Sequence, residues 1–166
     1  MQTDRKEALR YLGLGKHEPD PETERLLEEC IREAERAAEF RYLVREYPLS
    51  VEEDGTIDGG CFRVKSANLK KNLSGCDSVL VMAVTVGAEI DRLLARYGKL
   101  SVAKAVVMQA AAAAMVEAYC NELNSGWKKE YLEKGLYLRP RFSPGYGDFP
   151  LSAQKQILDG LEAGKR

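Results

Sequence analysis

The sequence predicts one α+β domain, with a mixed or antiparallel twisted sheet flanked by helices. Helical and strand-like segments are interspersed along the 166 residues without a steady strand–helix–strand rhythm, which disfavours a doubly wound parallel sheet. No internal repeat is present, and 45% hydrophobic residues are enough for one core at this length. We expect a helical N-terminal portion over about residues 1–45 and an α+β portion over about 46–166, within a single domain spanning residues 1–166.

Two helices are expected in the N-terminal portion. Residues 4–12 form the first, which glycines at 13 and 15 end. The second begins with Asp20 as N-cap and Pro21 at the first helical position, and its apolar residues continue at helical spacing to Ala38. His17 lies in the polar linker between them, where a solvated loop residue is a better interpretation than a catalyst.

Further elements follow from local signals. In residues 45–64, apolar and polar side chains alternate before and after the turn signal Asp54-Gly55, which predicts an irregular β-hairpin. A short helix follows, capped by Ser66 and closed by Gly75. The apolar run 79–86 predicts a central strand covered on both faces, and Gly87 leads into a helix over 88–96. The alanine-rich stretch 102–120 predicts a buried helix rather than a membrane span, because Lys104, Gln109 and Glu117 interrupt it.

Composition excludes several classes of function. Twenty-five basic residues against 26 acidic ones give a net charge of −1, without the basic excess that nucleic-acid binding requires. The four cysteines form no Cys-x-x-Cys pair and the single histidine lies far from them, so neither a metal site nor a disulfide is expected. The charged N-terminus lacks the apolar stretch of a signal peptide, which indicates a cytoplasmic protein without a membrane partner.

Residues 136–150 differ from the rest of the chain. Period-two alternation around Pro140 predicts an edge strand, and Pro144-Gly145 suits the two central positions of a type II turn. A loop stiffened in this way holds a binding-competent shape at low entropic cost. The guanidinium group of Arg141 can donate two parallel hydrogen bonds to a carboxylate. The alternative is a tight connection into the last helix with Tyr146 as a packing residue; the pattern alone leaves both open.

Glu117 ends the apolar stripe of the alanine-rich helix. It lies at the rim of a cleft, where it would bind a cation or an amine, or it is the first solvated position of a helix leaving the core. From the pattern alone the solvated interpretation is the better one, because glutamate is rarely buried.

At these two points the sequence resembles the activation (reactivation) domain of cobalamin-dependent methionine synthase, in its stand-alone form. Weaker similarity covers most of the chain, whereas family members continue past the last helix into further strands that this sequence, ending at Arg166, does not include. The matching residues are Arg141-x-x-Pro144-Gly145-Tyr146-x-x-x-Pro150 and Glu117-Ala118-Tyr119, with weaker matches at 81–87 and 10–13.

The resemblance implies the activation-domain fold and a site for S-adenosylmethionine. Arg141 would hold the methionyl carboxylate, Glu117 would meet the amino acid end of the ligand, and the backbone around Ser143, Gly145 and Tyr146 would contact the adenosine. These roles agree with the chemistry of the residue types, because arginine matches a carboxylate and glutamate complements an ammonium group.

The resemblance also implies an activity and its partners. The domain would supply the methyl group with which cob(II)alamin, held by methionine synthase or another corrinoid protein, is reductively methylated, and a flavodoxin-like donor would supply the electron. No residue would be catalytic, because the protein positions the ligand and the cofactor does the chemistry. The alternative is a non-catalytic interaction or regulatory module that contacts a corrinoid protein. A classical S-adenosylmethionine methyltransferase is disfavoured, because the glycine-rich first turn of such enzymes is absent.

Overall fold

The computed structural model describes residues 3–15 and 17–165, which divide into two compact units. The first unit consists of the chain up to Arg41 together with Val84–Glu130. The second consists of Tyr42–Ala83 together with the chain from Tyr131 onward. Helices make up the first unit, and the small sheets lie in the second, so the predicted α+β class is confirmed.

Two helices of the first unit begin after a capping aspartate, which the sequence predicts for Asp20. In α1 (Arg5–Tyr11) the Asp4 carboxylate accepts hydrogen bonds from the backbone of Lys6 and Glu7. In α2 (Pro21–Ala37) the Asp20 carboxylate accepts from the backbone N–H groups of Glu22 and Thr23, both at 3.0 Å. Each aspartate satisfies donors that have no partner inside the helix, and its charge suits the positive end of the helix dipole.

Between α1 and α2 the predicted loop is present. His17 is exposed, and its backbone N–H donates to the carbonyl of Leu14.

Two further helices complete the first unit and its core. These are α4 (Ala88–Leu100) and α5 (Val102–Glu133), the latter entering the second unit at Tyr131. Alanines of α5 let the neighbouring helices approach closely, because the methyl group is the smallest side chain of good helix propensity. The largest fully buried side chains of this core are Leu27, Ile90, Met108 and Met115.

Helix α5 is longer and less buried than the sequence predicts. It continues past Cys120 to Glu133 and ends where Gly135 takes a left-handed φ of 74° and Leu136 N–H donates to the carbonyl of Tyr131. In the described chain it is the one helix long and apolar enough to cross a membrane, and 39% of its most apolar window is buried. The prediction of a buried helix is therefore correct for one face only, and the packing of that face is compatible with a soluble protein.

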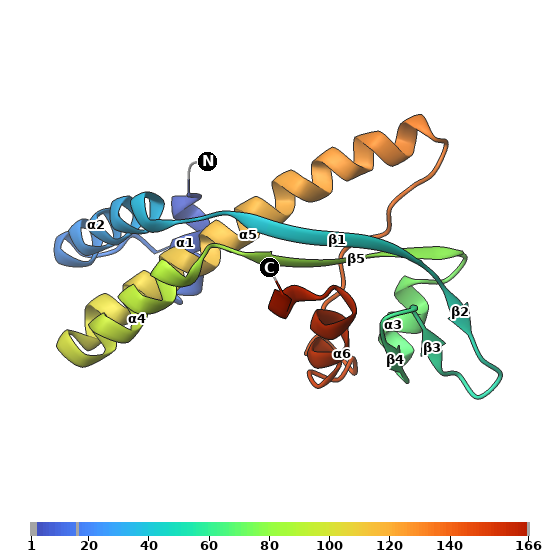
Figure 1. Ribbon diagram of the computed structural model, residues 1–166. Helices are drawn as coiled ribbons and strands as arrows, with labels where there is room; N and C mark the ends of the chain where they lie inside the picture. The colour runs from blue at the N-terminus through green and yellow to red at the C-terminus, as the bar shows by residue number, and fades with distance from the viewer. Residues whose placement is uncertain (1–2, 16, 166) are drawn as a thin grey trace. The chain divides into compact units, whose positions relative to one another are not determined.

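The longest strands of the second unit are β1 (Arg41–Pro48) and β5 (Ser78–Thr85), which form a two-stranded sheet. Figure 1 shows them side by side with opposite chain directions. Two predictions are wrong here. The helical portion ends before residue 45, because β1 already begins at Arg41. In addition β5 is not a central strand covered on both faces, since it has one neighbour and buries only Val81.

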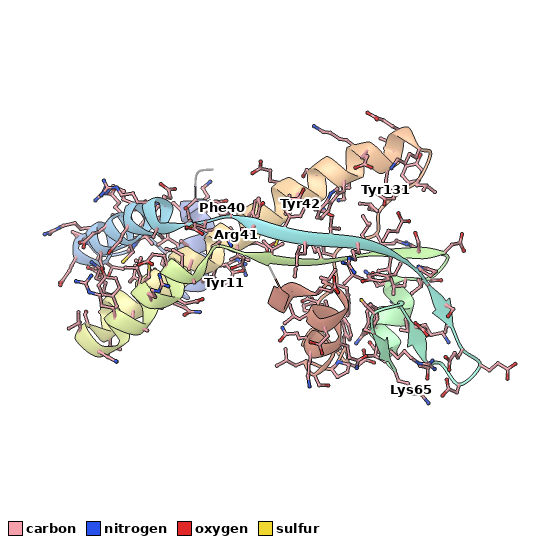
Figure 2. The ribbon with its side chains drawn as sticks, in the orientation of Figure 1. Tyr11, Phe40, Arg41, Tyr42, Lys65 and Tyr131 are labelled. Atoms are coloured by element: carbon pink, nitrogen blue, oxygen red, sulfur yellow. The ribbon has the colours of Figure 1, made fainter. Side chains whose placement is uncertain are left out.

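The carboxylate of Glu46 links three elements of the second unit. It accepts hydrogen bonds from Ser78 Oγ at 2.6 Å and from the hydroxyl of Tyr131, labelled in Figure 2, at 2.7 Å. These hydrogen bonds, that of Ser78 foremost, lower the pKa of Glu46. The glutamate thus ties β1 to β5 and to the last turn of α5.

A second sheet is antiparallel and small, as the predicted irregular hairpin requires. Its strands are β2 (Ser50–Val51), β3 (Ile57–Asp58) and β4 (Arg63–Val64), with Val51 opposite Ile57 and Ile57 opposite Val64. The turn at Asp54-Gly55 is confirmed: Gly55 has a φ of 83°, and Glu52 N–H donates to the carbonyl of Thr56.

Three short helical elements lie in the second unit, and the two longer ones contribute side chains to a second core. They are α3 (Ala67–Asn72), α6 (Ala153–Gly160) and the 3₁₀ turn η1 (Ala163–Lys165). Ser66 caps α3 as predicted, with its Oγ accepting from Leu69 N–H at 3.0 Å. The buried members of the second core are Ile57, Phe62, Val64, Leu69, Val81, Phe149, Ala153 and Leu161.

Candidate binding groove

The predicted turn at Pro144-Gly145 is present in the second unit. Tyr146 N–H donates to the carbonyl of Ser143 at 3.1 Å, which closes a four-residue turn, and Gly145 at its third position has a φ of 90°. That φ is the value a type II turn requires there, and glycine adopts it without strain. Two more backbone hydrogen bonds, Gly145 to Phe149 and Phe149 to Tyr146, fold the loop back on itself.

The segment that leads into this turn is not the predicted edge strand. Residues 136–143 are extended but pair with no strand in the described chain. Side chains hold it instead: Asn72 Nδ2 donates to the carbonyl of Pro140 at 3.2 Å, and Arg139 donates to the carbonyl of Ser74 at 2.8 Å. Pro140 has no N–H to give to a ladder, so carbonyl groups and side chains provide the hydrogen bonds.

Asp148 joins the loop to the start of α3. Its carboxylate accepts hydrogen bonds from Ser66 Oγ, from Ala67 N–H at 2.6 Å and from Asn68 N–H at 3.1 Å. These hydrogen bonds, that of Ser66 foremost, hold the pKa of Asp148 below its usual range. The loop is therefore fixed to α3 by a residue 80 positions away in the sequence.

An open groove of about 430 Å³ lies between α3 and the loop. One wall is the exposed side of α3, and the other is the extended segment and the turn. The first wall consists of Asn68, Lys71 and Asn72, and the second of Arg139, Pro140, Phe142, Tyr146 and Gly147.

Two of the residues that line the groove, Phe142 and Tyr146, are aromatic. The ring of Phe142 lies edge-on to that of Tyr146, with centroids 5.4 Å apart, and stacks on Phe149 at 6.3 Å. Phe149 is buried in the second core, whereas Tyr146 is 68% exposed. The rings therefore run from the core to the surface, and Tyr146 offers a face to a flat ligand.

The charged side chains on the groove walls are both basic. Lys71 and Arg139 contribute ammonium and guanidinium groups, and Asn68 and Asn72 contribute amides. The carboxylate of Asp148 is taken up by three donors of α3. A ligand with an anionic end and a planar ring matches this combination of cations, amides and aromatic faces.

The five residues predicted from the sequence are placed as follows. Tyr146 lines the groove, and Ser143 and Gly145 form the turn that carries it. Arg141 is half-buried between two lining residues, Pro140 and Phe142, but is not itself on the groove wall. Glu117 lies half-buried on α5 in the first unit, so its proposed role stays a prediction.

Sequence reasoning missed the α3 wall of the groove, and it missed Asp148, which joins the loop to α3. Asn68, Lys71 and Asn72 look in the sequence like ordinary residues of a short solvated helix. Asp148 carries no local signal, because its partners lie at 66–68. Arg139 lies in the segment around Pro140 that was predicted to be an edge strand, and a strand prediction gives no sign that its side chain lines a groove.

A second groove, of about 570 Å³, lies in the first unit. Its walls are almost entirely apolar, and they bring together Tyr11 of α1, Gly98 of α4 and Val102, Val106 and Gln109 of α5. Val102 is 74% exposed. With one amide and one phenol as its polar side chains, this groove offers little chemistry to a polar ligand, and the groove of the second unit is the better candidate site.

The protein is a mixed α+β protein with an open groove lined by polar and aromatic residues. No family model matches the chain, and no curated protein matches it either. Its function is therefore inferred from the groove, the ordered turn and the motif around Arg141.

Proposed function

We propose that the chain binds S-adenosylmethionine through residues 139–149 and acts as a reactivation module for a cobalamin-dependent methionine synthase or a related corrinoid protein. The observation that carries this proposal is the ordered turn Ser143–Tyr146, which sets an exposed tyrosine ring on the wall of a basic groove. The same residues carry the resemblance to the activation domain. Pro144, Gly145 and Tyr146 of that motif belong to the turn beside the groove, which supports the proposal.

The groove suits the parts of this ligand. The adenine ring would lie against Tyr146, with the amides of Asn68 and Asn72 available to its ring nitrogens. The methionyl carboxylate would be held by Arg141, as the resemblance implies, in a field made more positive by Lys71 and Arg139. Such a site binds and orients, and it needs no general acid or base.

In this function the chain holds and orients the methyl donor. The sulfonium methyl group would be transferred to cobalamin carried by the partner, after a flavodoxin-like donor supplies one electron to cob(II)alamin; S-adenosylhomocysteine and methylcobalamin are the products. The protein contributes proximity and orientation, which are large terms when two reactants must meet in one geometry.

Titration of S-adenosylmethionine by calorimetry tests the ligand. We expect saturable binding to the wild type and a loss of about 1.5–3 kcal/mol of binding free energy in Arg141→Ala, the value of a hydrogen bond to a charged group. Arg63→Ala is the matched control: Arg63 lies in the same unit, pairs with Glu52 and Asp58, and lies outside the 139–149 segment that the proposal assigns to the ligand. Wild-type protein that binds no ligand at millimolar concentration would reject the proposal.

A second assay separates the reactivation module from the non-catalytic alternative. The purified chain is mixed with a cob(II)alamin-loaded corrinoid protein, a chemical reductant and S-adenosylmethionine labelled in its methyl group. Label that appears in methylcobalamin, and depends on the chain, supports methyl transfer. Binding of the ligand without transfer of label would instead favour an interaction or regulatory module.

A further inference from the structure

The two walls of the groove are separate pieces of chain that must be held in register. One wall is α3, and the other is the segment that runs from Arg139 to Gly147. At one end the amide of Asn72 holds the carbonyl of Pro140. At the other end, next to Tyr146 and Gly147, the link between the walls is the carboxylate of Asp148.

Capping of α3 does not by itself require Asp148. Ser66 already caps this helix in the usual local way, since its Oγ accepts from Leu69 N–H three residues on. Asp148 adds acceptors for the preceding donors, Ala67 N–H and Asn68 N–H, and for the hydroxyl of Ser66 itself. It contributes a long-range tether in addition to the local cap.

The backbone beside Asp148 is packed tightly against α3. Gly147 has a φ of 58°, and a Cβ added there would lie 2.6 Å from Asn68 Nδ2. The loop can approach this closely because position 147 has no side chain. The position of Tyr146, the next residue back along the chain, is therefore set by how Asp148 and Gly147 seat on the helix.

We infer that Asp148 is a positioning residue for the groove: by binding the first turn of α3 it fixes Tyr146 opposite Asn68 and Lys71, and so fixes the width of the ligand site. This inference rests on the proposed function for the identity of the ligand. The tether itself is a property of the protein without ligand. The tether and the binding of ligand are therefore measured separately.

Hydrogen exchange of the free protein tests the tether. Asp148→Asn keeps the size of the side chain but replaces one acceptor oxygen by a donor, so we expect exchange at residues 143–149 to become about tenfold faster. Asp54→Asn is the matched control, because Asp54 accepts from Thr56 N–H at 2.9 Å and pairs with Lys65, labelled in Figure 2, away from the groove. Exchange at 143–149 that stays unchanged in Asp148→Asn would overturn the inference, whatever the ligand.

Affinity for S-adenosylmethionine tests the positioning. We expect Asp148→Asn to weaken binding about tenfold and Asp54→Asn to leave it unchanged. In a Tyr146→Ala background the same Asp148→Asn change should weaken binding less than threefold, because the ring that Asp148 positions is gone. Equal losses in both backgrounds would show that Asp148 does not act through Tyr146, and would overturn the inference.

The two proposals fail in different ways. If the wild type binds no S-adenosylmethionine, the proposed function fails, and the exchange measurement still decides on the tether. If the wild type binds and Asp148→Asn binds equally well, the proposed function stands and the positioning role is rejected. Asp148→Ala, which removes every acceptor, should exceed Asp148→Asn in both measurements, and a smaller effect would contradict the tether.

Discussion

Lys104 shows how single side chains hold the first unit together. Its Nζ binds the carboxylate of Glu29, lies 3.4 Å from Glu33 Oε2 and sits 4.4 Å from the centre of the Tyr97 ring. The lysine side chain is only 17% exposed, and the hydrogen bond with Glu29 raises its pKa. One cation thus connects α2, α4 and α5, with its stem packed and its charge paired.

Cys30 gives a prediction for alkaline pH. Burial raises the pKa of this thiol from about 9 to about 11, and its Sγ lies 3.9 Å from the carbonyl of Lys104. The unfolded thiol ionises first as the pH rises, so the contribution of Cys30 is fully present below pH 9 and is lost toward pH 11. Between pH 8 and pH 10 we expect the wild type to lose about 1 kcal/mol more unfolding free energy than Cys30→Ala, measured by urea denaturation. Equal losses in the two proteins would contradict a raised pKa.

At the scale of elements, the junction between β5 and α4 depends on one glycine. Gly87 has a φ of 95°, and a Cβ added there would lie 2.9 Å from Glu39 Cβ. Glu39 cannot move away freely, because its backbone N–H donates to the carbonyl of Val86 at 2.8 Å. This contact and this hydrogen bond hold the start of β1 beside the end of β5, at the point where both strands adjoin helices.

Two glycine substitutions should therefore change the free energy of unfolding in opposite directions. Gly87→Ala is expected to cost about 1–3 kcal/mol of unfolding free energy through strain and the contact with Glu39. Gly98→Ala, inside α4 with open space around the added Cβ, should stabilise by up to about 1 kcal/mol through helix propensity. Thermal or urea unfolding measures both, and destabilisation by Gly98→Ala would show that the backbone near Gly98 is not relaxed.

At the scale of the whole molecule, two separate cores are the main feature. The first core is made of helix side chains around Leu27 and Met108, and the second surrounds Ile57 and Phe149 beneath the small sheet. The chain passes between the units within β1, near the end of β5 and within α5. Each unit buries its own apolar side chains, so each has its own local stability.

Reciprocal core substitutions test this division. Ile57→Ala and Leu27→Ala each remove a fully buried branched side chain and should cost about 2–5 kcal/mol in the unit concerned. We expect hydrogen exchange to become faster mainly in residues 42–83 and from 131 onward for Ile57→Ala, and mainly in the other unit for Leu27→Ala. Uniform acceleration along the whole chain in either variant would show that the two units open together.

Local signals in the sequence were sufficient for many elements and for the turn of the candidate site. The starts of α2 and α3 follow from Asp20 and Ser66, because a cap bonds donors two or three residues away. The turn at Pro144-Gly145 likewise depends on φ preferences of adjacent residues. The extension of α5 beyond Cys120 was missed, because the polar residues that follow Cys120 interrupt the apolar pattern although the helix continues to Glu133.

The sequence by itself determined the α+β class, the capped helix starts and the ordered Ser143–Tyr146 turn, because each depends on neighbours along the chain. Only the tertiary structure decided that, within the described residues, β5 has β1 as its partner strand, that residues 136–143 belong to no strand and that α3 supplies one wall of the groove. The contact of Asp148 with Ser66 joins positions 82 residues apart. No local pattern contains such a contact, since it exists only once the chain between the two residues has folded.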